Sequence, residues 1–287
     1  VKDVDLVLGG HDHLARIVYD GRDMTASSGS QGEFIAKTVI VMDKVEKRGK
    51  MSLVWSPSFD LVATADVTPE PTVQAQVDEY TAALDRELGQ VIGSSGVDLD
   101  TRRAAIRSQE TTFGNLVADA SREATGADIA IANGGGIRGD TLYPAGTQIT
   151  RKMVLTELPF GNTTVKLEVT GKQVREALEH GVSGIEDGQG RFPQVSGMTY
   201  SFDASKPVGQ RILQVLVHDQ PLDDNKVYTL ATNDYVGTGG DGYGMFKGSK
   251  VLVDKDAGGL LATQVIDYVI QRSTISPTVN GRIKRVD

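Results

Sequence analysis

Short apolar runs separated by turn residues mark the first part of the chain. Each run has the length and the alternation of a strand, and segments such as Tyr19–Arg22 and Lys47–Lys50 supply the turns between runs. The pattern predicts four strands in the first 65 residues: Val4–Leu8, Ala15–Tyr19, Ile35–Asp43 and Met51–Phe59.

A single long helix is predicted next. The segment 68–71, TPEP, places prolines where the first helical turn tolerates them, and Gly89 is a suitable end. Between them, apolar residues recur every three or four positions, as on one helix face: Val73, Val77, Tyr80, Leu84 and Leu88. We expect residues 66–90 to connect two differently patterned regions, 1–65 and 91–287.

Helical and strand patterns alternate after residue 90. Gly126 is placed to end one helix, and Thr170 with Gln173 forms a capping-box pattern for another. The predicted helices are Phe113–Thr125, Lys172–His180 and Gly258–Gln271. The predicted strands are Ala127–Ala132, Thr163–Val169, Gly197–Phe202, Ile212–His218 and Val227–Thr232. The fold class predicted for this region is mixed α/β (α+β).

Composition narrows the possible partners. The 287 residues carry a net charge of −8, which argues against a nucleic-acid polymer as partner because such binding needs a basic surface. A mononucleotide needs only a few local arginines and remains possible. The absence of cysteine excludes disulfides, thiolate metal sites and cysteine nucleophiles. No apolar run approaches the roughly 20 residues of a membrane span.

The first residues suggest a chain that begins inside a longer protein. The sequence starts VKDVDLVLGGHDH, with a buried-strand pattern and no Met. His11 and His13 are two positions apart, so in an extended segment both imidazoles point the same way and can face one metal ion. Two nitrogens are not a complete site. A polar turn with two chance histidines is the alternative.

Three arginines form a second group of candidates. Arg103 and Arg107 are four residues apart, and Arg138 ends the segment NGGGIR, which starts at Asn133 directly after a predicted strand. Guanidinium groups bind phosphates, carboxylates and hydroxyl pairs with fixed geometry. The glycines before Arg138 permit close approach of a ligand. Solvated surface charge is the ordinary alternative for each arginine.

Two aromatic residues lie in glycine-rich or turn segments. The segment 232–246, TNDYVGTGGDGYGMF, combines the ring of Tyr235 with glycines and the carboxylate of Asp241. The segment LPFGN places Phe160 two residues before Asn162. Aromatic faces stack on any nucleobase, and a carboxylate accepts hydrogen bonds from vicinal hydroxyls. A surface turn and a hydrophobic plug are the alternatives.

Together these segments resemble the C-terminal domain of the 5'-nucleotidases, a family that includes UDP-sugar hydrolases and ecto-5'-nucleotidases. NGGGIR, LPFGN, the arginine pair before FGNLVADA (113–120) and TNDYVGTGGDGY (232–243) occur in the family's order. The likeness extends from about Val73 to Gln271. VDLVLGGHDH is similar to the last metal-binding motif of the family's calcineurin-like metallophosphoesterase domain.

The resemblance implies a role for each candidate. Phe160 and Tyr235 would sandwich the base, although the family usually has Phe at the second position. Asp241 would hold ribose hydroxyls, and Asn133 and Asn162 would contact the base edge. The arginines would hold ribose hydroxyls or the substrate phosphate: Arg103, Arg107 and Arg138.

The resemblance also implies the chemistry of a longer protein. His11 and His13 match metal ligands of a centre with two divalent ions (Zn, Mn, Co or Mg), whose other ligands would precede Val1. Residues 1–65 would be the end of the metallophosphoesterase domain, and this chain alone would be inactive. Alternatives are a UDP-sugar hydrolase, a 2',3'-cyclic-nucleotide phosphodiesterase, a thiosulfate-oxidation relative or an inactive nucleoside-binding module. A periplasmic, cell-surface or secreted location is expected from the family.

Overall fold

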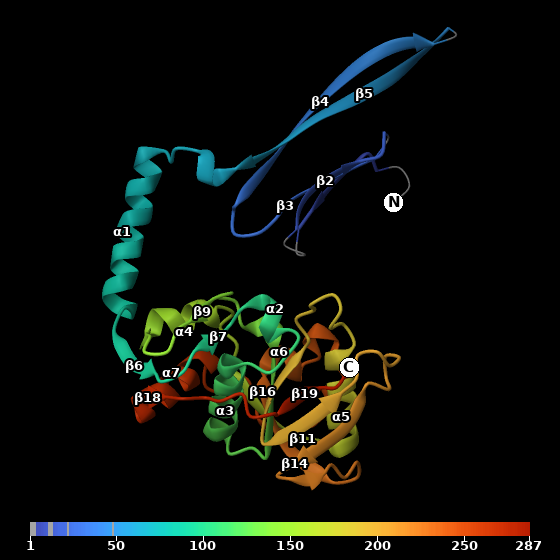
Figure 1. Ribbon diagram of the computed structural model, residues 1–287. Coiled ribbons are helices and arrows are strands. Elements are labelled where there is room, and N and C mark those ends of the chain that lie inside the picture. Colours follow the sequence, from blue (N-terminus) through green and yellow to red (C-terminus); the bar gives the residue numbers. More distant parts are fainter. Residues whose placement is uncertain (1–3, 11–13, 22, 48) are drawn as a thin grey trace. The chain divides into compact units, whose positions relative to one another are not determined.

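The computed structural model describes residues 4–10, 14–21, 23–47 and 49–287. The chain divides into two compact units, Val1–Tyr80 and Thr81–Asp287 (Figure 1). The division falls inside the helix α1 (Pro71–Leu88), which ends directly before Gly89 as the sequence predicted. The carboxylate of Glu70 accepts a hydrogen bond from the backbone nitrogen of Val73 at 2.7 Å and so caps the helix. None of the described helices is long and apolar enough to cross a membrane.

The first unit consists of a small sheet and a long hairpin. In the sheet, β3 (Met24–Ser28) pairs in parallel with β1 (Leu6–Gly9) and antiparallel with β2 (Ala15–Tyr19). The hairpin joins β4 (Phe34–Lys47) to β5 (Lys50–Ala63), each of 14 residues. The four predicted strands are present. The sequence missed β3 because MTASS lacks an apolar run. It underestimated the hairpin, whose ladder continues through mixed polar and apolar residues such as 44–47 and 60–63.

A five-stranded mixed sheet forms the centre of the second unit, in the order β12-β8-β16-β11-β17. Strand β8 pairs in parallel with β16, whereas the other neighbouring pairs are antiparallel. The strands are β8 (Ile129–Asn133), β11 (Thr164–Thr170), β12 (Pro193–Ser196), β16 (Val227–Asn233) and β17 (Lys250–Val253). The parallel pair brings two strand ends to the same edge of the sheet.

Side chains of β8 alternate between two hydrophobic clusters. Ile129 and Ile131 pack in the cluster that contains α5 (Gly171–Val182). Ala130 packs with alanines of α3 (Thr112–Thr125) and β16, which lets that helix lie close to the sheet. Helix α3 also packs against α7 (Leu261–Arg272) in a second cluster. The sheet is therefore covered on both faces, and the predicted mixed α/β fold is confirmed.

Smaller elements surround this core. A four-stranded sheet has the order β15-β14-β13-β19, and a three-stranded sheet has the order β10-β6-β18. Their strands are β13 (Met198–Phe202), β14 (Ile212–Val217), β15 (Gln220–Pro221), β19 (Ile283–Arg285), β6 (Val91–Ser95), β10 (Gln148–Thr150) and β18 (Thr274–Ile275). The remaining elements are β7 (Leu99–Asp100), β9 (Leu142–Tyr143), α2 (Arg103–Ile106), α4 (Arg151–Glu157), α6 (Asp234–Gly237) and the 3-10 turns η1 (Thr64–Asp66), η2 (Gly134–Gly136), η3 (Gly240–Gly242) and η4 (Gly244–Phe246).

Local helix signals in the sequence are confirmed. The hydroxyl of Thr170 accepts from the backbone of Gln173, and the Gln173 side chain accepts from the backbone of Thr170, which completes the capping box. Gly126 takes the left-handed conformation (φ 58°) at the end of α3. The last helix begins at Leu261 rather than Gly258, because the nitrogen of Gly258 bonds to the carbonyl of Asp254 in a preceding turn.

Candidate functional site

Two asparagines meet where the parallel strands end. Asn133 is the last residue of β8 and Asn233 is the last of β16, and both are buried. The Nδ2 group of Asn233 donates to Oδ1 of Asn133 at 2.9 Å. The Oδ1 atom of Asn233 accepts from the backbone nitrogen of Val236 at 2.8 Å and caps α6. The asparagine pair therefore joins the two strand ends to the helix that carries Tyr235.

Asp241 is held by three side chains around this pair. Asn133 Nδ2 donates to its Oδ2 at 2.7 Å, and the hydroxyl of Tyr235 donates to its Oδ1 at 3.1 Å. The backbone carbonyl of Asp241 lies 2.8 Å from Nε2 of His180, on α5. A carbonyl only accepts, so this nitrogen carries the proton. Asp241 has φ 51°, so these contacts fix a carboxylate in an uncommon backbone conformation.

Glycines allow the loops to approach one another here. A Cβ on Gly240 would lie 2.5 Å from Cε2 of Tyr235, so the backbone itself packs against the ring. A Cβ on Gly135 would lie 2.8 Å from Cα of Gly190, and the nitrogen of Gly135 donates to the carbonyl of Gly190 at 2.7 Å. A larger residue at position 240 would displace the ring of Tyr235, and one at position 135 would separate the NGGGIR loop from the loop that carries Gly190.

Arg107 is a buried cation beside this network. It directly follows α2 and is 8% exposed. Its Nη1 donates to the carbonyl of Gly188 at 3.2 Å, and its buried Nε has no hydrogen-bond partner in the described part of the chain. Burial, followed by the charges of Arg103 and Arg138, lowers the pKa of Arg107 to about 10, and Asp241 partly opposes this. Such a group favours an incoming anion.

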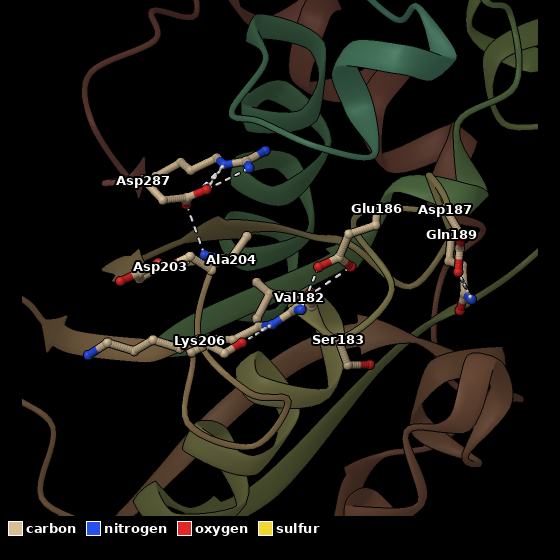
Figure 2. Close-up of polar contacts among 12 residues, drawn as sticks. Val182, Ser183, Glu186, Asp187, Gln189, Asp203, Ala204, Lys206 and Asp287 are labelled. Atoms are coloured by element: carbon tan, nitrogen blue, oxygen red, sulfur yellow. Dashed lines mark hydrogen bonds and ion pairs between the residues drawn. The ribbon is translucent and has the colours of Figure 1, made fainter.

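The loop that carries Gly188 is fixed at its beginning by Arg211, which is also buried. Figure 2 shows the groups in this region, among them Val182, Glu186 and Lys206. Arg211 Nη1 donates to the carbonyl of Val182 at 2.8 Å and to the carboxylate of Glu186 at 3.1 Å. Its Nε donates to the carbonyl of Lys206 at 3.1 Å. This cation is fully engaged and acts as a structural clamp, in contrast to Arg107.

The other two predicted arginines lie nearby, Arg103 at the start of α2 and Arg138 in the loop that follows η2. The backbone nitrogen of Arg103 donates to Asp140 at 2.7 Å, which ties α2 to the loop after NGGGIR. The guanidinium carbon of Arg138 lies 5.5 Å from the ring centroid of Phe160. This distance is within the range of a cation–π contact. The structure therefore groups the three arginines electrostatically and places one of them against a predicted stacking ring.

The LPFGN segment is joined to the other aromatic segment. The side chain of Phe160 is 59% exposed, and Gly161 has φ 65°. Asn162 Nδ2 donates to Oδ1 of Asp234 at 2.8 Å, directly before Tyr235 in the chain. A mostly apolar cavity of about 250 Å³ lies here, lined by Gly136, Leu155, Leu158, Pro159, Phe160, Gly161, Asn162, Asn233, Leu260, Leu261 and Ala262.

Three residues of this site were missed from the sequence: Asn233, His180 and Glu157. Glu157 is completely buried and accepts from the hydroxyl of Tyr143 at 2.7 Å and from the nitrogen of Gly139 at 2.9 Å. Burial raises the pKa of its carboxyl. Its backbone carbonyl accepts from the nitrogen of Arg138 at 2.9 Å, so Glu157 supports the arginine loop. A lone acidic residue before LPFGN gives no sequence signal of this burial.

The predicted metal ligands His11 and His13 lie outside the described residues. Among the residues that the structure describes, no group of three or more His, Cys, Asp or Glu side chains is arranged to hold a metal ion. The eight remaining predicted residues all belong to the second unit, on the loops, helix ends and strand end described above.

Comparison with known proteins identifies similar chains. Residues 91–248 match the family described as "5'-nucleotidase, C-terminal domain". The chain is 33% identical to the "Trifunctional nucleotide phosphoesterase protein YfkN" of Bacillus subtilis, over 100% of this chain and 20% of that protein. It is 28% identical to a 5'-nucleotidase of Diplobatis ommata, over 100% of this chain and 55% of that protein.

A solved structure shows the same fold. The crystal structure of a 5'-nucleotidase precursor from Thermus thermophilus matches with a TM-score of 0.77 and 29% identity, covering 99% of this chain and 60% of that one. The chain therefore spans a little over half the length of this protein and of the Diplobatis relative.

Proposed function

Since the chain belongs to the 5'-nucleotidase family through its C-terminal domain, we propose that its second unit binds the nucleoside part of a nucleotide substrate. The base would stack between the rings of Phe160 and Tyr235, and Asn133 and Asn162 would contact its edge. Stacking contributes about 1–3 kcal/mol per base and tolerates different bases.

Asp241 would accept hydrogen bonds from the ribose hydroxyls. The observation that carries the proposal is the arrangement around this carboxylate, which hydrogen bonds from Asn133 and Tyr235 fix at the end of two parallel strands. A fixed carboxylate beside an exposed ring is suited to a sugar attached to a stacked base.

The arginines would hold the phosphate and the ribose oxygens. Arg107 supports this role because burial and two neighbouring guanidiniums lower its pKa, and an anion would relieve that unfavourable charge. Arg103 and Arg138 would complete the positive region. We therefore propose nucleoside monophosphates, or related esters, as the ligands of this unit.

The whole protein would hydrolyse nucleoside phosphates to nucleoside and phosphate. Residues 1–65 would be the end of a metallophosphoesterase domain, 66–90 a connector and 91–287 the nucleotide-binding domain, with His11 and His13 as ligands of two divalent metals. When bound, such metals supply a hydroxide nucleophile and neutralise charge on the phosphate. The described residues include no metal-binding cluster. We propose that this chain alone does not hydrolyse phosphate esters.

A broader ester range is the second candidate. The relative from Bacillus subtilis is called a trifunctional nucleotide phosphoesterase, which favours activity on more than one phosphoester, such as a 2',3'-cyclic nucleotide or a UDP-sugar. Profiling the full-length protein with these substrates would separate the candidates. An exported location is part of the same proposal, and fractionation of the native cells would test it.

Calorimetric titration of this chain with adenosine, AMP and uridine tests the binding proposal. We expect binding of all three and a loss of about 1–3 kcal/mol in the Tyr235→Ala variant, because the stacking ring is removed. The control is Tyr80→Ala, because Tyr80 is 71% exposed and lies in the first unit, outside the proposed site. Tyr228 is buried, so its replacement by alanine would disturb the fold and is not a suitable control. Equal affinity in Tyr235→Ala and Tyr80→Ala would contradict the stacking role.

A further inference from the structure

The carboxylate of Asp241 has one protein donor on each oxygen. Tyr235 donates to Oδ1 at 3.1 Å and Asn133 donates to Oδ2 at 2.7 Å. A carboxylate oxygen accepts about two hydrogen bonds, so each oxygen retains capacity for one more. The remaining capacity therefore matches two neighbouring hydroxyl groups, one on each oxygen.

The hydroxyl of Tyr235 connects the proposed stacking ring with this carboxylate. The ring is packed by the backbone of Gly240, which fixes the direction of the hydroxyl. A neutral phenol has a single proton to donate, and here it is directed to Asp241. A phenylalanine would keep the stacking face and lose only this hydrogen bond.

Asn233 determines how the amide of Asn133 is oriented. The backbone N–H of Val236 requires an oxygen, which fixes Oδ1 of Asn233 toward α6 and turns its Nδ2 toward Asn133. Oδ1 of Asn133 accepts that donor, so its Nδ2 must face Asp241. In the reverse orientation, an amide oxygen would face a carboxylate, and two acceptors would oppose each other.

We propose that the Tyr235 hydroxyl and the Asn233 amide are positioning groups that orient Asp241, so that the site selects ligands with two free vicinal hydroxyls. Ribonucleosides and their 5'-phosphates would be preferred over 2',3'-dideoxy ligands or ligands blocked at these hydroxyls. The inference rests on the proposed function, because it requires that a nucleoside is bound here.

Two conservative variants test the inference on the whole chain. Tyr235→Phe removes the hydroxyl and keeps the ring. Asn233→Ser removes the amide donor to Asn133, adds no charge, and keeps an oxygen at the N-cap of α6, where Ser is favourable. The matched control is Tyr228→Phe. Tyr228 lies on β16, the strand that ends at Asn233, and its hydroxyl accepts a hydrogen bond from the backbone nitrogen of Asp223, away from the site. Each protein is titrated calorimetrically with adenosine and with 2',3'-dideoxyadenosine.

We expect Tyr235→Phe and Asn233→Ser each to weaken adenosine binding about fivefold to tenfold, as for loss of one ordinary hydrogen bond, because Asp241 remains present but is less well oriented. Dideoxyadenosine binding should change by less than about twofold, and the control should change neither affinity. In an Asp241→Ala background, Tyr235→Phe should have no further effect on adenosine. A merely structural role would instead weaken both ligands together.

The remaining outcomes distinguish failure of the positioning role from failure of the proposed nucleoside binding. Equal losses for both ligands, or no loss for either, would overturn the positioning role. If the unaltered protein bound adenosine and dideoxyadenosine equally, the selection for hydroxyls would be wrong while the stacking site would stand. If it bound neither ligand, the inference and the proposed function would both fail.

Discussion

Replacing Arg107 by methionine should make the ligand-free protein more stable. Arg107 is buried, its Nε is unpaired in the described chain, and the charges of Arg103 and Arg138 act against it. Methionine has a similar length and no charge, so it fills the same space without the cost of a buried cation. The side chain that weakens the free protein is the one proposed to hold the phosphate.

The magnitude follows from the pKa. Because the folded protein lowers the pKa of Arg107 to about 10, well below the usual arginine value, it disfavours the charged form by about 3 kcal/mol. Because the folded pKa is the lower one, this cost is fully present at every pH below about 10 and disappears only as the pH rises toward the usual arginine pKa of the unfolded chain. Methionine also loses the hydrogen bond to Gly188, about 1 kcal/mol, so the expected net gain is about 2 kcal/mol.

Urea unfolding at pH 7 is the assay. Far-UV circular dichroism follows mainly the second unit, which contains most of the helices, whereas the fluorescence of Trp55, the single tryptophan, follows the first unit. The dichroism midpoint should rise in Arg107→Met and should not rise in Arg107→Lys, which keeps a charge. A fixed concentration of AMP should stabilise the unaltered protein more than Arg107→Met, because the variant binds the ligand more weakly.

A less stable Arg107→Met protein would refute the reasoning. It would mean that the guanidinium makes favourable interactions in the free protein that outweigh its desolvation. Equal stabilisation of both proteins by AMP would separately remove Arg107 from the phosphate site. A rise in stability together with a loss of AMP stabilisation is the combination that the structure supports.

Three further predictions concern other groups of the second unit. Burial raises the pKa of Glu157, so the stability of the unaltered protein relative to Glu157→Gln should fall as the pH rises above 4.5, measured by thermal melts across that range. Arg211→Ala should lower the unfolding free energy by about 3 kcal/mol in urea titrations, because it leaves the carbonyls of Val182 and Lys206 without this donor. Thr170→Ala should cost about 1 kcal/mol in the same titration, and Thr170→Ser should restore most of it.

The parts of the fold that depend on neighbouring residues were predictable from the sequence. The capping box of Thr170 and Gln173 and the helix end at Gly126 each involve residues within four positions. Their geometry is set by local backbone donors and acceptors, whatever the rest of the chain does. The start of α7 was predicted three residues early because Gly258 is held by a turn that no helical periodicity reveals.

The interior of the site depends on contacts that no local pattern encodes. Asn133 and Asn233 are 100 residues apart and meet only because β8 and β16 pair in parallel. The burial of Glu157 requires Tyr143 and Gly139 to close over it. The sequence indicated the groups that could face a ligand, namely rings, arginines and one carboxylate. It did not indicate that Asn133 and Tyr235 hold Asp241, or that Asn233 and Glu157 support the surrounding segments.

The site combines a carboxylate whose hydrogen bonds are well satisfied with a buried cation whose surroundings are unfavourable. Asp241 has a left-handed backbone, yet its side chain and carbonyl have three protein partners. Arg107 is buried with an unpaired Nε in the described chain, and only a carbonyl accepts from it. The first arrangement fixes a carboxylate before a ligand arrives, so little ordering remains to be done on binding. The second leaves a cation whose interactions improve when an anion arrives. The proposed sugar site would therefore be preorganised, whereas binding at the proposed phosphate site would draw on the relief of an electrostatic cost. AMP should then stabilise the protein more than adenosine does at the same concentration.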